Sequence, residues 1–228
     1  MRDIKIAPSL LAADAAKLGE EVCRVEKAGA EWLHLDIMDG HFVPNLSYSA
    51  QVVKALRPLS NMFFDVHLMI SEPQKYIDDF IDAGADLITV HTEAVKSTYK
   101  LREIADYLHS KNIKAGVSIK PKTSVEEVKD VLDVFDMLLI MTVEPGFGGQ
   151  SYMADMEDKI KAAASIAHNE YKHLDIQVDG GISLKTVSHA ASCGANIFVA
   201  GSAVFNASDT NAVVSELRRL ASDAYTKR

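Results

Sequence analysis

Cysteine is scarce in this sequence, and no long apolar run occurs in it. The two cysteines among the 228 residues, Cys23 and Cys193, lie in helix-like segments without CxxC spacing, so we expect two reduced thiols and no disulfide. No apolar run approaches the about 20 residues that span a bilayer, and the N-terminal residues show no basic segment followed by an apolar one. These absences exclude a disulfide scaffold and a membrane protein, and they predict a soluble, cytoplasmic protein.

Runs of lysine or arginine are also missing. The formal net charge of −8 offers no basic surface for nucleic acid, but it leaves open a small anionic metabolite held by local groups. With 48% hydrophobic and 25% charged residues, the chain can bury a substantial core. Its length favours one α/β domain over residues 1–228 rather than two small domains.

Short apolar runs alternate with amphipathic segments along the whole chain. Eight runs are typical of strands: 4–9, 32–37, 63–69, 87–91, 114–119, 137–142, 175–179 and 197–202. Apolar spacing predicts helices over 16–29, 74–84, 98–112, 124–135 and 185–194. Eight strands alternating with helices predict an α/β fold of the (β/α)8 TIM-barrel type. A doubly wound sheet needs a phosphate-binding fingerprint after the first strand, and the stretch IAPSLLAAD offers none.

Polar side chains interrupt two of the predicted strands. His34 and Asp36 alternate with apolar neighbours in EWLHLDIMDGHFVPN, so both point to the same face, and Asp65 and His67 share a face in the same way. Burying such groups without partners is costly. In a barrel of this type, groups at the carboxyl ends of the strands converge on one mouth, where Asp179 also falls.

Two imidazoles and two carboxylates at a barrel mouth are typical of a divalent metal site, and zinc, iron, manganese and cobalt are all compatible with this donor set. The alternative for His34 or His67 taken singly is a core histidine with satisfied hydrogen bonds. His91, which ends the fourth predicted strand before Thr92 and Glu93, is interpreted either as a hydrogen-bonding partner of the site or as a structural residue.

Glycines follow the last three predicted strands. Gly181, Gly201 and Ser202 are candidates for holding a phosphate through backbone N–H groups, because the loops after strands seven and eight often do so in such barrels. The run from Gly146 to Gly149 in EPGFGGQ is interpreted as a mobile flap over the site. The alternative is that these glycines only form tight turns.

Three methionines fall near the same strand ends. Met38 follows Asp36 by two residues, Met69 follows His67 by two, and Met141 ends the sixth predicted strand. They could form an apolar roof that removes water from a reacting centre, or they could simply fill gaps in the core.

Taken together, these motifs resemble the ribulose-phosphate 3-epimerase family of ribulose-phosphate-binding barrels. The resemblance runs through IAPSLLAAD, LHLDIMDGHFVPN, DVHLMI, GVSIKP, MTVEPGFGGQ, VDGGI and VAGSAVF. It implies interconversion of D-ribulose 5-phosphate and D-xylulose 5-phosphate through an enediolate, in the pentose phosphate pathway. It also implies a sugar phosphate as the partner, with no nucleic acid and no membrane, and a homo-oligomer.

The resemblance assigns roles to particular positions of this sequence. The metal ligands are His34, Asp36, His67 and Asp179, holding one divalent ion for which zinc and iron are favoured over manganese and cobalt. The acid/base pair is Asp36 and Asp179. Substrate contacts fall on Ser9, His67, Gly146, Phe147, Gly148, Gly149, Gly180, Gly181, Gly201 and Ser202.

Three other functions stay open on the sequence. An epimerase of a six-carbon ketose phosphate could use the same site with another pocket shape. An aldolase or decarboxylase on a related barrel would call for an Asp-x-Lys-x-x-Asp array, but neither LHLDIMDG nor DVHLMI contains a lysine. A non-catalytic barrel that binds sugar phosphate or stores metal would keep the ligands without needing an opposed acid/base pair.

Overall fold

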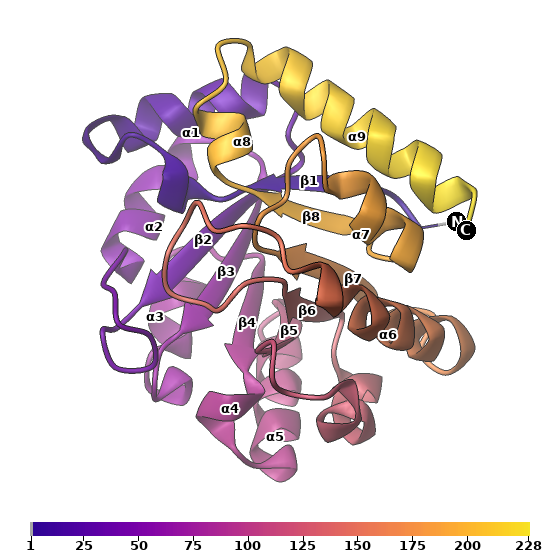
Figure 1. Ribbon diagram of the computed structural model, residues 1–228. Coiled ribbons are helices and arrows are strands. Elements are labelled where there is room, and N and C mark those ends of the chain that lie inside the picture. Colours follow the sequence, from indigo (N-terminus) through magenta and orange to yellow (C-terminus); the bar gives the residue numbers. More distant parts are fainter. Residues whose placement is uncertain (1) are drawn as a thin grey trace.

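All eight expected strands are present in the structure, a computed structural model that describes residues 2–228 (Figure 1). They form one parallel sheet in the order β1-β8-β7-β6-β5-β4-β3-β2. Their bounds are β1 Lys5–Pro8, β2 Trp32–Met38, β3 Phe63–Met69, β4 Leu87–His91, β5 Lys114–Ile119, β6 Met137–Met141, β7 Asp175–Asp179 and β8 Ile197–Ala200. The predicted (β/α)8 barrel is confirmed.

The barrel closes between β1 and β2 by a contact unlike the others. Every other neighbouring pair of strands shares a ladder, whereas the described residues of β1 and β2 meet through an isolated parallel bridge between Ser9 and His34. The hydroxyl of Ser9 then donates a 2.6 Å hydrogen bond to Asp36 Oδ2. Closure of the barrel therefore falls on polar residues at the mouth.

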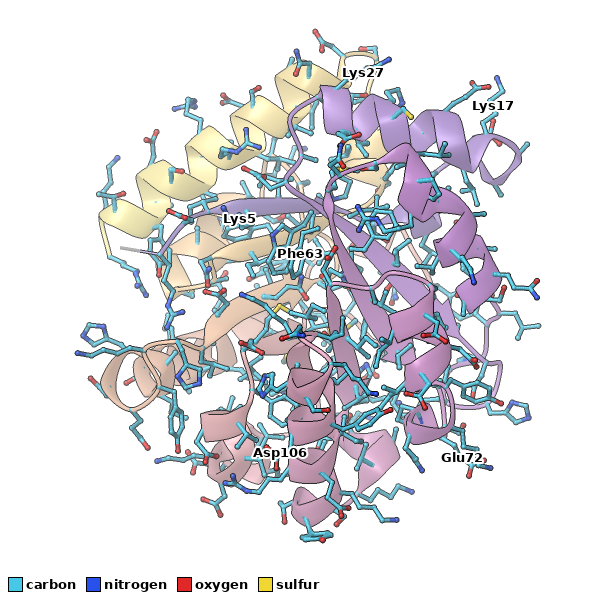
Figure 2. All side chains as sticks on the ribbon, turned by 180° about the vertical axis from the view of Figure 1, so that it is seen from behind. Lys5, Lys17, Lys27, Phe63, Glu72 and Asp106 are labelled. Atoms are coloured by element: carbon cyan, nitrogen blue, oxygen red, sulfur yellow. The ribbon has the colours of Figure 1, made fainter. Side chains whose placement is uncertain are left out.

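Helices surround the sheet on its outer side, as Figure 1 shows. They are α1 Leu18–Lys27, α2 Ala50–Leu56, α3 Ile77–Asp82, α4 Thr92–Val95, α5 Thr98–Ser110, α6 Glu157–Asn169, α7 Val187–Cys193, α8 Ser202–Phe205 and α9 Thr210–Thr226. Two of the longer ones, α5 and α9, begin at capping residues: Ser97 accepts a hydrogen bond from Lys100 N, and Asp209 accepts one from Ala212 N. Figure 2 shows charged side chains such as Lys27 and Asp106 projecting away from this outer layer.

One predicted helix is wrong, and five of the described α-helices lie outside the predicted helical segments. The segment 124–135 forms two 3₁₀ helices, Val125–Glu127 and Lys129–Val134, in place of an α-helix. Its valines at 125, 128, 131 and 134 recur every three residues, which matches the three-residue turn of a 3₁₀ helix and places them on one face. The additional helices are α2, α4, α6, α8 and α9.

Two apolar layers hold the barrel together. The larger lies between sheet and helices and includes Val22, Phe64 and Leu217, all fully buried. The smaller fills the barrel interior, where Trp32 stacks on Phe63 with ring centroids 4.3 Å apart; Phe63 lies near the centre of the view in Figure 2. Both cysteines are free thiols. Within residues 2–228, no helix is long and apolar enough to cross a membrane.

Candidate active site

A cavity opens at the carboxyl ends of the strands. Its lining includes nearly all the residues that the sequence assigned to the site: Ser9, Asp36, Met38, Met69, Met141, Gly146, Phe147, Gly148, Gly149, Asp179, Gly180, Gly181, Gly201 and Ser202. The two remaining candidates, His34 and His67, are fully buried beneath this floor. The topology thus brings together residues from both halves of the chain.

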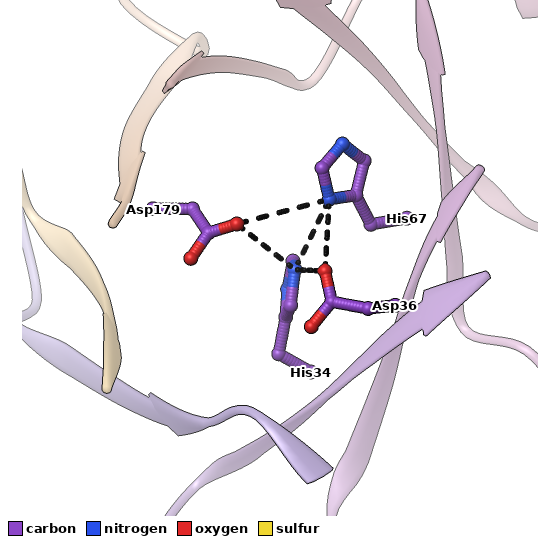
Figure 3. A group of neighbouring side chains, drawn as sticks. All are labelled: His34, Asp36, His67 and Asp179. Atoms are coloured by element: carbon purple, nitrogen blue, oxygen red, sulfur yellow. Dashed lines mark hydrogen bonds and ion pairs between the residues drawn. The ribbon is translucent and has the colours of Figure 1, made fainter. Parts of the chain in front are cut away.

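Four side chains at the floor point toward one another (Figure 3). The atoms His34 Nε2, His67 Nδ1 and Asp36 Oδ1 lie 3.3 Å from each other in every pair. Asp179 Oδ2 lies 3.9 Å from His34 Nε2 and 4.0 Å from His67 Nδ1. Because β2, β3 and β7 each present alternate residues to the interior, three strands deliver four ligand-type atoms to one point.

This cluster fits a divalent metal ion. In a tetrahedral site with ligand distances of about 2.0–2.2 Å, neighbouring ligand atoms lie roughly 3.3–3.6 Å apart. All four candidate atoms lie within 4.8 Å of one another, and three of them already have the tetrahedral spacing. Two imidazole nitrogens and two carboxylate oxygens are also a donor set that zinc and other transition metals accept.

Asp65 orients His34 from below. Its Oδ2 lies 2.7 Å from His34 Nδ1 and also accepts a 2.5 Å hydrogen bond from Gln177 Nε2. The Nδ1 nitrogen therefore donates to Asp65, and Nε2 faces the cluster. The sequence pattern places Asp65 on the same face as His67 but does not indicate this role; the signal that could have revealed it is the position of Asp65 opposite His34 in the β2–β3 register. Gln177, in contrast, is brought in from β7 only by barrel closure.

His67 is held in a similar way by His91. The two Nε2 atoms lie 2.9 Å apart, and His91 Nδ1 lies 3.1 Å from Glu93 Oε2. Burial is the largest cause that lowers the pKa of His91, to about 4. Burial opposes ionisation of Glu93, but hydrogen bonds from His91, Thr123 and Lys120 N outweigh it and lower the pKa of Glu93 to about 2.

The two carboxylates of the cluster have opposite pKa shifts. Burial disfavours the charged form of both. At Asp36 the charge of His34 and hydrogen bonds with His34 and His67 outweigh burial and hold its pKa well below the usual range. At Asp179 burial is reinforced by the negative charge of Asp36, which raises the pKa of Asp179 well above the usual range. Near neutral pH Asp36 is therefore ionised, whereas the pKa of Asp179, raised to about 7, leaves that carboxyl group divided between its protonated and ionised forms.

The histidines also differ. Burial opposes protonation of His34, but the negative charges of Asp65 and Asp36 outweigh it and raise the pKa of His34 well above 6.5. Burial lowers the pKa of His67, although the carboxylate of Asp36, whose Oδ1 lies 3.3 Å from His67 Nδ1, acts in the opposite direction. A proton and a metal ion therefore compete for His34 Nε2.

The three methionines lie where an apolar roof was expected. Met38, Met69 and Met141 are all buried and line the cavity. Met38 and Met69 also pack with Val43 in a small apolar cluster at the mouth. These side chains form part of the apolar lining of the cavity.

The glycine-rich loops form the rim of the cavity. Gly181 has φ of +67°, and a Cβ there would lie 2.2 Å from Tyr152 N, so only glycine allows this close approach. At Gly201 a Cβ would meet Ala12 Cβ at 3.2 Å. The carbonyl oxygen of Gly146 accepts a 2.8 Å hydrogen bond from Asn45 Nδ2, a contact between two loops that the sequence did not indicate.

Comparison with known proteins agrees with this geometry. The model of the ribulose-phosphate 3 epimerase family matches residues 5–205. Ribulose-phosphate 3-epimerase of Schizosaccharomyces pombe is 48% identical over 221 residues, covering 96% of this chain and 94% of the relative. The Bacillus subtilis protein of that name is 44% identical over 216 residues, covering 94% of this chain and 98% of the relative.

Solved structures share the fold at much lower identity. KGPDC from Streptococcus mutans superposes with a TM-score of 0.71 at 13% identity, covering 98% of this chain and 100% of that one. The 3-hexulose-6-phosphate synthase from Salmonella typhimurium gives 0.70 at 17% identity, covering 97% and 100%. These likenesses establish the barrel architecture alone.

The barrel and its mouth define the protein as a TIM-barrel enzyme with a buried carboxylate and imidazole site. More particularly, the chain belongs to the ribulose-phosphate 3-epimerase family, whose members are isomerases that act on a carbohydrate phosphate.

Proposed function

We propose that this protein interconverts D-ribulose 5-phosphate and D-xylulose 5-phosphate by removing and returning the proton at C3. The observation that carries the proposal is the pair Asp36 and Asp179, two carboxylates on different strands with opposite pKa shifts at the floor of one cavity. The names of the relatives in Schizosaccharomyces pombe and Bacillus subtilis support the same substrate.

Epimerisation makes two demands that this pair meets. A proton next to a ketone is weakly acidic, so a positioned base must remove it from one face of the substrate, and an acid must return a proton to the other face. Asp36 and Asp179 face the cavity from different strands, so one can act as the base and the other as the acid in one direction, and the roles exchange in the reverse direction. Ser9 donates to Asp36 Oδ2 and so holds this carboxylate in place.

We propose His34, Asp36, His67 and Asp179 as the ligands of one divalent metal ion, zinc or iron in the first place. When bound, the ion would supply Lewis-acid stabilisation for negative charge that develops on the oxygens at C2 and C3. His67 is fully buried and approaches the substrate side only through Nδ1, so its contribution is that of a ligand.

The cavity rim is proposed to bind the rest of the substrate. Gly180, Gly181, Gly201 and Ser202 would hold the phosphate through backbone N–H groups, because no lysine or arginine occurs among the described residues that line the cavity. The loop Gly146, Phe147, Gly148 and Gly149 would close over the sugar, and the buried Met38, Met69 and Met141 would exclude water beside it.

The absence of lysine among the described lining residues also argues against an aldolase or decarboxylase that depends on an Asp-x-Lys-x-x-Asp array. A barrel that only binds sugar phosphate would have no need for two carboxylates with opposite pKa shifts. A six-carbon ketose phosphate is distinguished by kinetics: kcat/KM for ribulose 5-phosphate should exceed that for allulose 6-phosphate.

The test is incubation with ribulose 5-phosphate in deuterated water. The wild-type protein should form xylulose 5-phosphate with deuterium at C3. Asp36→Asn and Asp179→Asn should each lose about a hundredfold or more in turnover, because each removes one proton carrier. A variant that keeps the base on one face should still wash deuterium into one epimer without converting it to the other.

Metal content must be measured beside activity, since both aspartates are also proposed ligands. Asp155→Asn, at an exposed position outside the cavity, is the matched control and should retain full turnover. The proposal fails if either cavity variant, folded and metal-loaded, epimerises at close to the wild-type rate.

A further inference from the structure

A chain of buried hydrogen bonds leads away from the proposed metal ligand His67 toward the surface. His67 Nε2 lies 2.9 Å from His91 Nε2, and His91 Nδ1 lies 3.1 Å from Glu93 Oε2. Both rings are completely buried, and the Glu93 side chain is 22% exposed. The inference drawn from this chain rests on the metal site proposed above.

The hydrogen bond between His67 Nε2 and His91 Nε2 contains one hydrogen atom. Two bare nitrogens at this distance would repel each other, so one Nε2 must donate and the other must accept. The ionised carboxylate of Glu93 can only accept, so the hydrogen of a neutral His91 lies on Nδ1 and its Nε2 accepts. His67 Nε2 then carries the hydrogen, and His67 Nδ1 presents a lone pair to the cluster of Figure 3.

Glu93 is itself fixed by donors on its other oxygen. Its Oε1 accepts hydrogen bonds from Lys120 N at 2.7 Å and from Thr123 Oγ1 at 2.5 Å. The ring of Phe42 packs against His91 with centroids 4.8 Å apart. The carboxylate therefore cannot rotate away from His91 without losing two hydrogen bonds.

We propose that Glu93 is a positioning residue that sets the tautomer of His67 through His91 and so keeps His67 Nδ1 free to bind the metal. Asp65 acts on His34 in the same sense by a direct contact, so the two histidines are oriented by two carboxylates at different distances. Such partners of metal-binding histidines fix the ring and raise its basicity as a ligand.

The variant Glu93→Gln should exchange the donor and acceptor roles along this chain of hydrogen bonds while the volume of the side chain stays nearly constant. An amide has one acceptor oxygen, and Lys120 N and Thr123 Oγ1 already claim it, so the amide NH₂ would face His91 Nδ1. His91 would then carry its hydrogen on Nε2 and donate to His67, which would place a hydrogen on His67 Nδ1 where the metal binds.

The experiment is a titration of the full-length protein with Zn²⁺ against a chromophoric chelator, together with ¹⁵N NMR of histidine-labelled protein. Glu93→Gln should lower zinc affinity about tenfold to a hundredfold relative to wild type. Without added zinc, the hydrogen on His91 should move from Nδ1 in the wild type to Nε2 in the variant. Glu126→Gln, which makes the same charge change at an exposed site, should alter neither.

The outcomes separate this inference from the function on which it rests. Unchanged zinc affinity in Glu93→Gln, or weaker binding with the His91 hydrogen unmoved, would overturn it. If the variant does not fold, the zinc-loaded wild type still decides, since His91 protonated on Nε2 would contradict the tautomer chain. A wild-type protein that binds no zinc would instead remove the metal site itself.

Discussion

Asp39, in the loop after β2, accepts backbone hydrogen bonds whose contribution to the free energy of unfolding can be measured. Its carboxylate accepts three backbone hydrogen bonds, each of 2.8 Å, from His41 N, Phe42 N and Ser71 N. Burial opposes its ionisation, but these three donors outweigh burial and lower the pKa of Asp39 from 3.8 to about 2. The variant Asp39→Asn keeps the size of the side chain and leaves one acceptor oxygen for the three donors.

The lowered pKa of Asp39 gives the size of the expected loss in the free energy of unfolding. A shift of nearly two units corresponds to roughly 2.5 kcal/mol at about 1.4 kcal/mol per unit. Because the side chain is partly exposed, solvent screening reduces the expected loss in the free energy of unfolding to about 1–2 kcal/mol. The folded-state pKa is depressed, so this stabilisation is complete above the unfolded-state pKa near 3.8 and is lost as pH falls toward about 2.

Urea unfolding of wild type and Asp39→Asn at several pH values measures this difference. The gap between the two proteins should be constant at neutral pH and should narrow below about pH 4. Asp155→Asn, at an exposed position, serves as the control for a change of charge alone. A gap that is absent at neutral pH, or that does not narrow in acid, would refute the assignment of the three backbone hydrogen bonds as its source.

Three further predictions concern the site. Strong chelation should abolish activity while circular dichroism stays that of the folded barrel, because the ligands lie at the mouth and the apolar layers do not depend on them; full activity in metal-free protein would contradict this. Gly201→Val should raise KM for ribulose 5-phosphate by obstructing the approach beside Ala12, and an unchanged KM would show that the phosphate lies elsewhere. Zinc affinity should rise with pH through the neutral range, because the raised pKa of His34 means that zinc binding displaces a proton. Zinc titrations in a pH series would contradict this if the affinity did not change with pH.

The sequence predicted the strands because their patterns are local. All eight runs of apolar residues form strands, since fully buried parallel strands leave long apolar runs in the sequence. The segment 124–135 was interpreted as an α-helix although its valines recur every three residues, which is the period of the 3₁₀ helices observed there. The helix α9 was missed even though it begins at a capping aspartate, Asp209.

Some residues of the site could likewise be predicted from local sequence patterns, and others could not. His34, Asp36, His67 and Asp179 could be placed together because strand ends in a barrel converge. Gln177 beneath Asp65 depends on how the barrel closes across its interior, which strand patterns do not specify. The contact of Asn45 with Gly146 depends on the path of two loops, whose conformations follow from tertiary packing and not from local sequence.

The bridge between Ser9 and His34 links the folding of the barrel to the assembly of its site. It is the contact that completes the ring of strands, and it joins a proposed substrate residue to a proposed metal ligand. A chain in which β1 has not yet met β2 therefore lacks both a closed barrel and the hydrogen bond from Ser9 to Asp36. During refolding, recovery of activity and pairing of β1 with β2 should therefore have the same rate constant. Enzyme activity then measures the last step in closing the barrel.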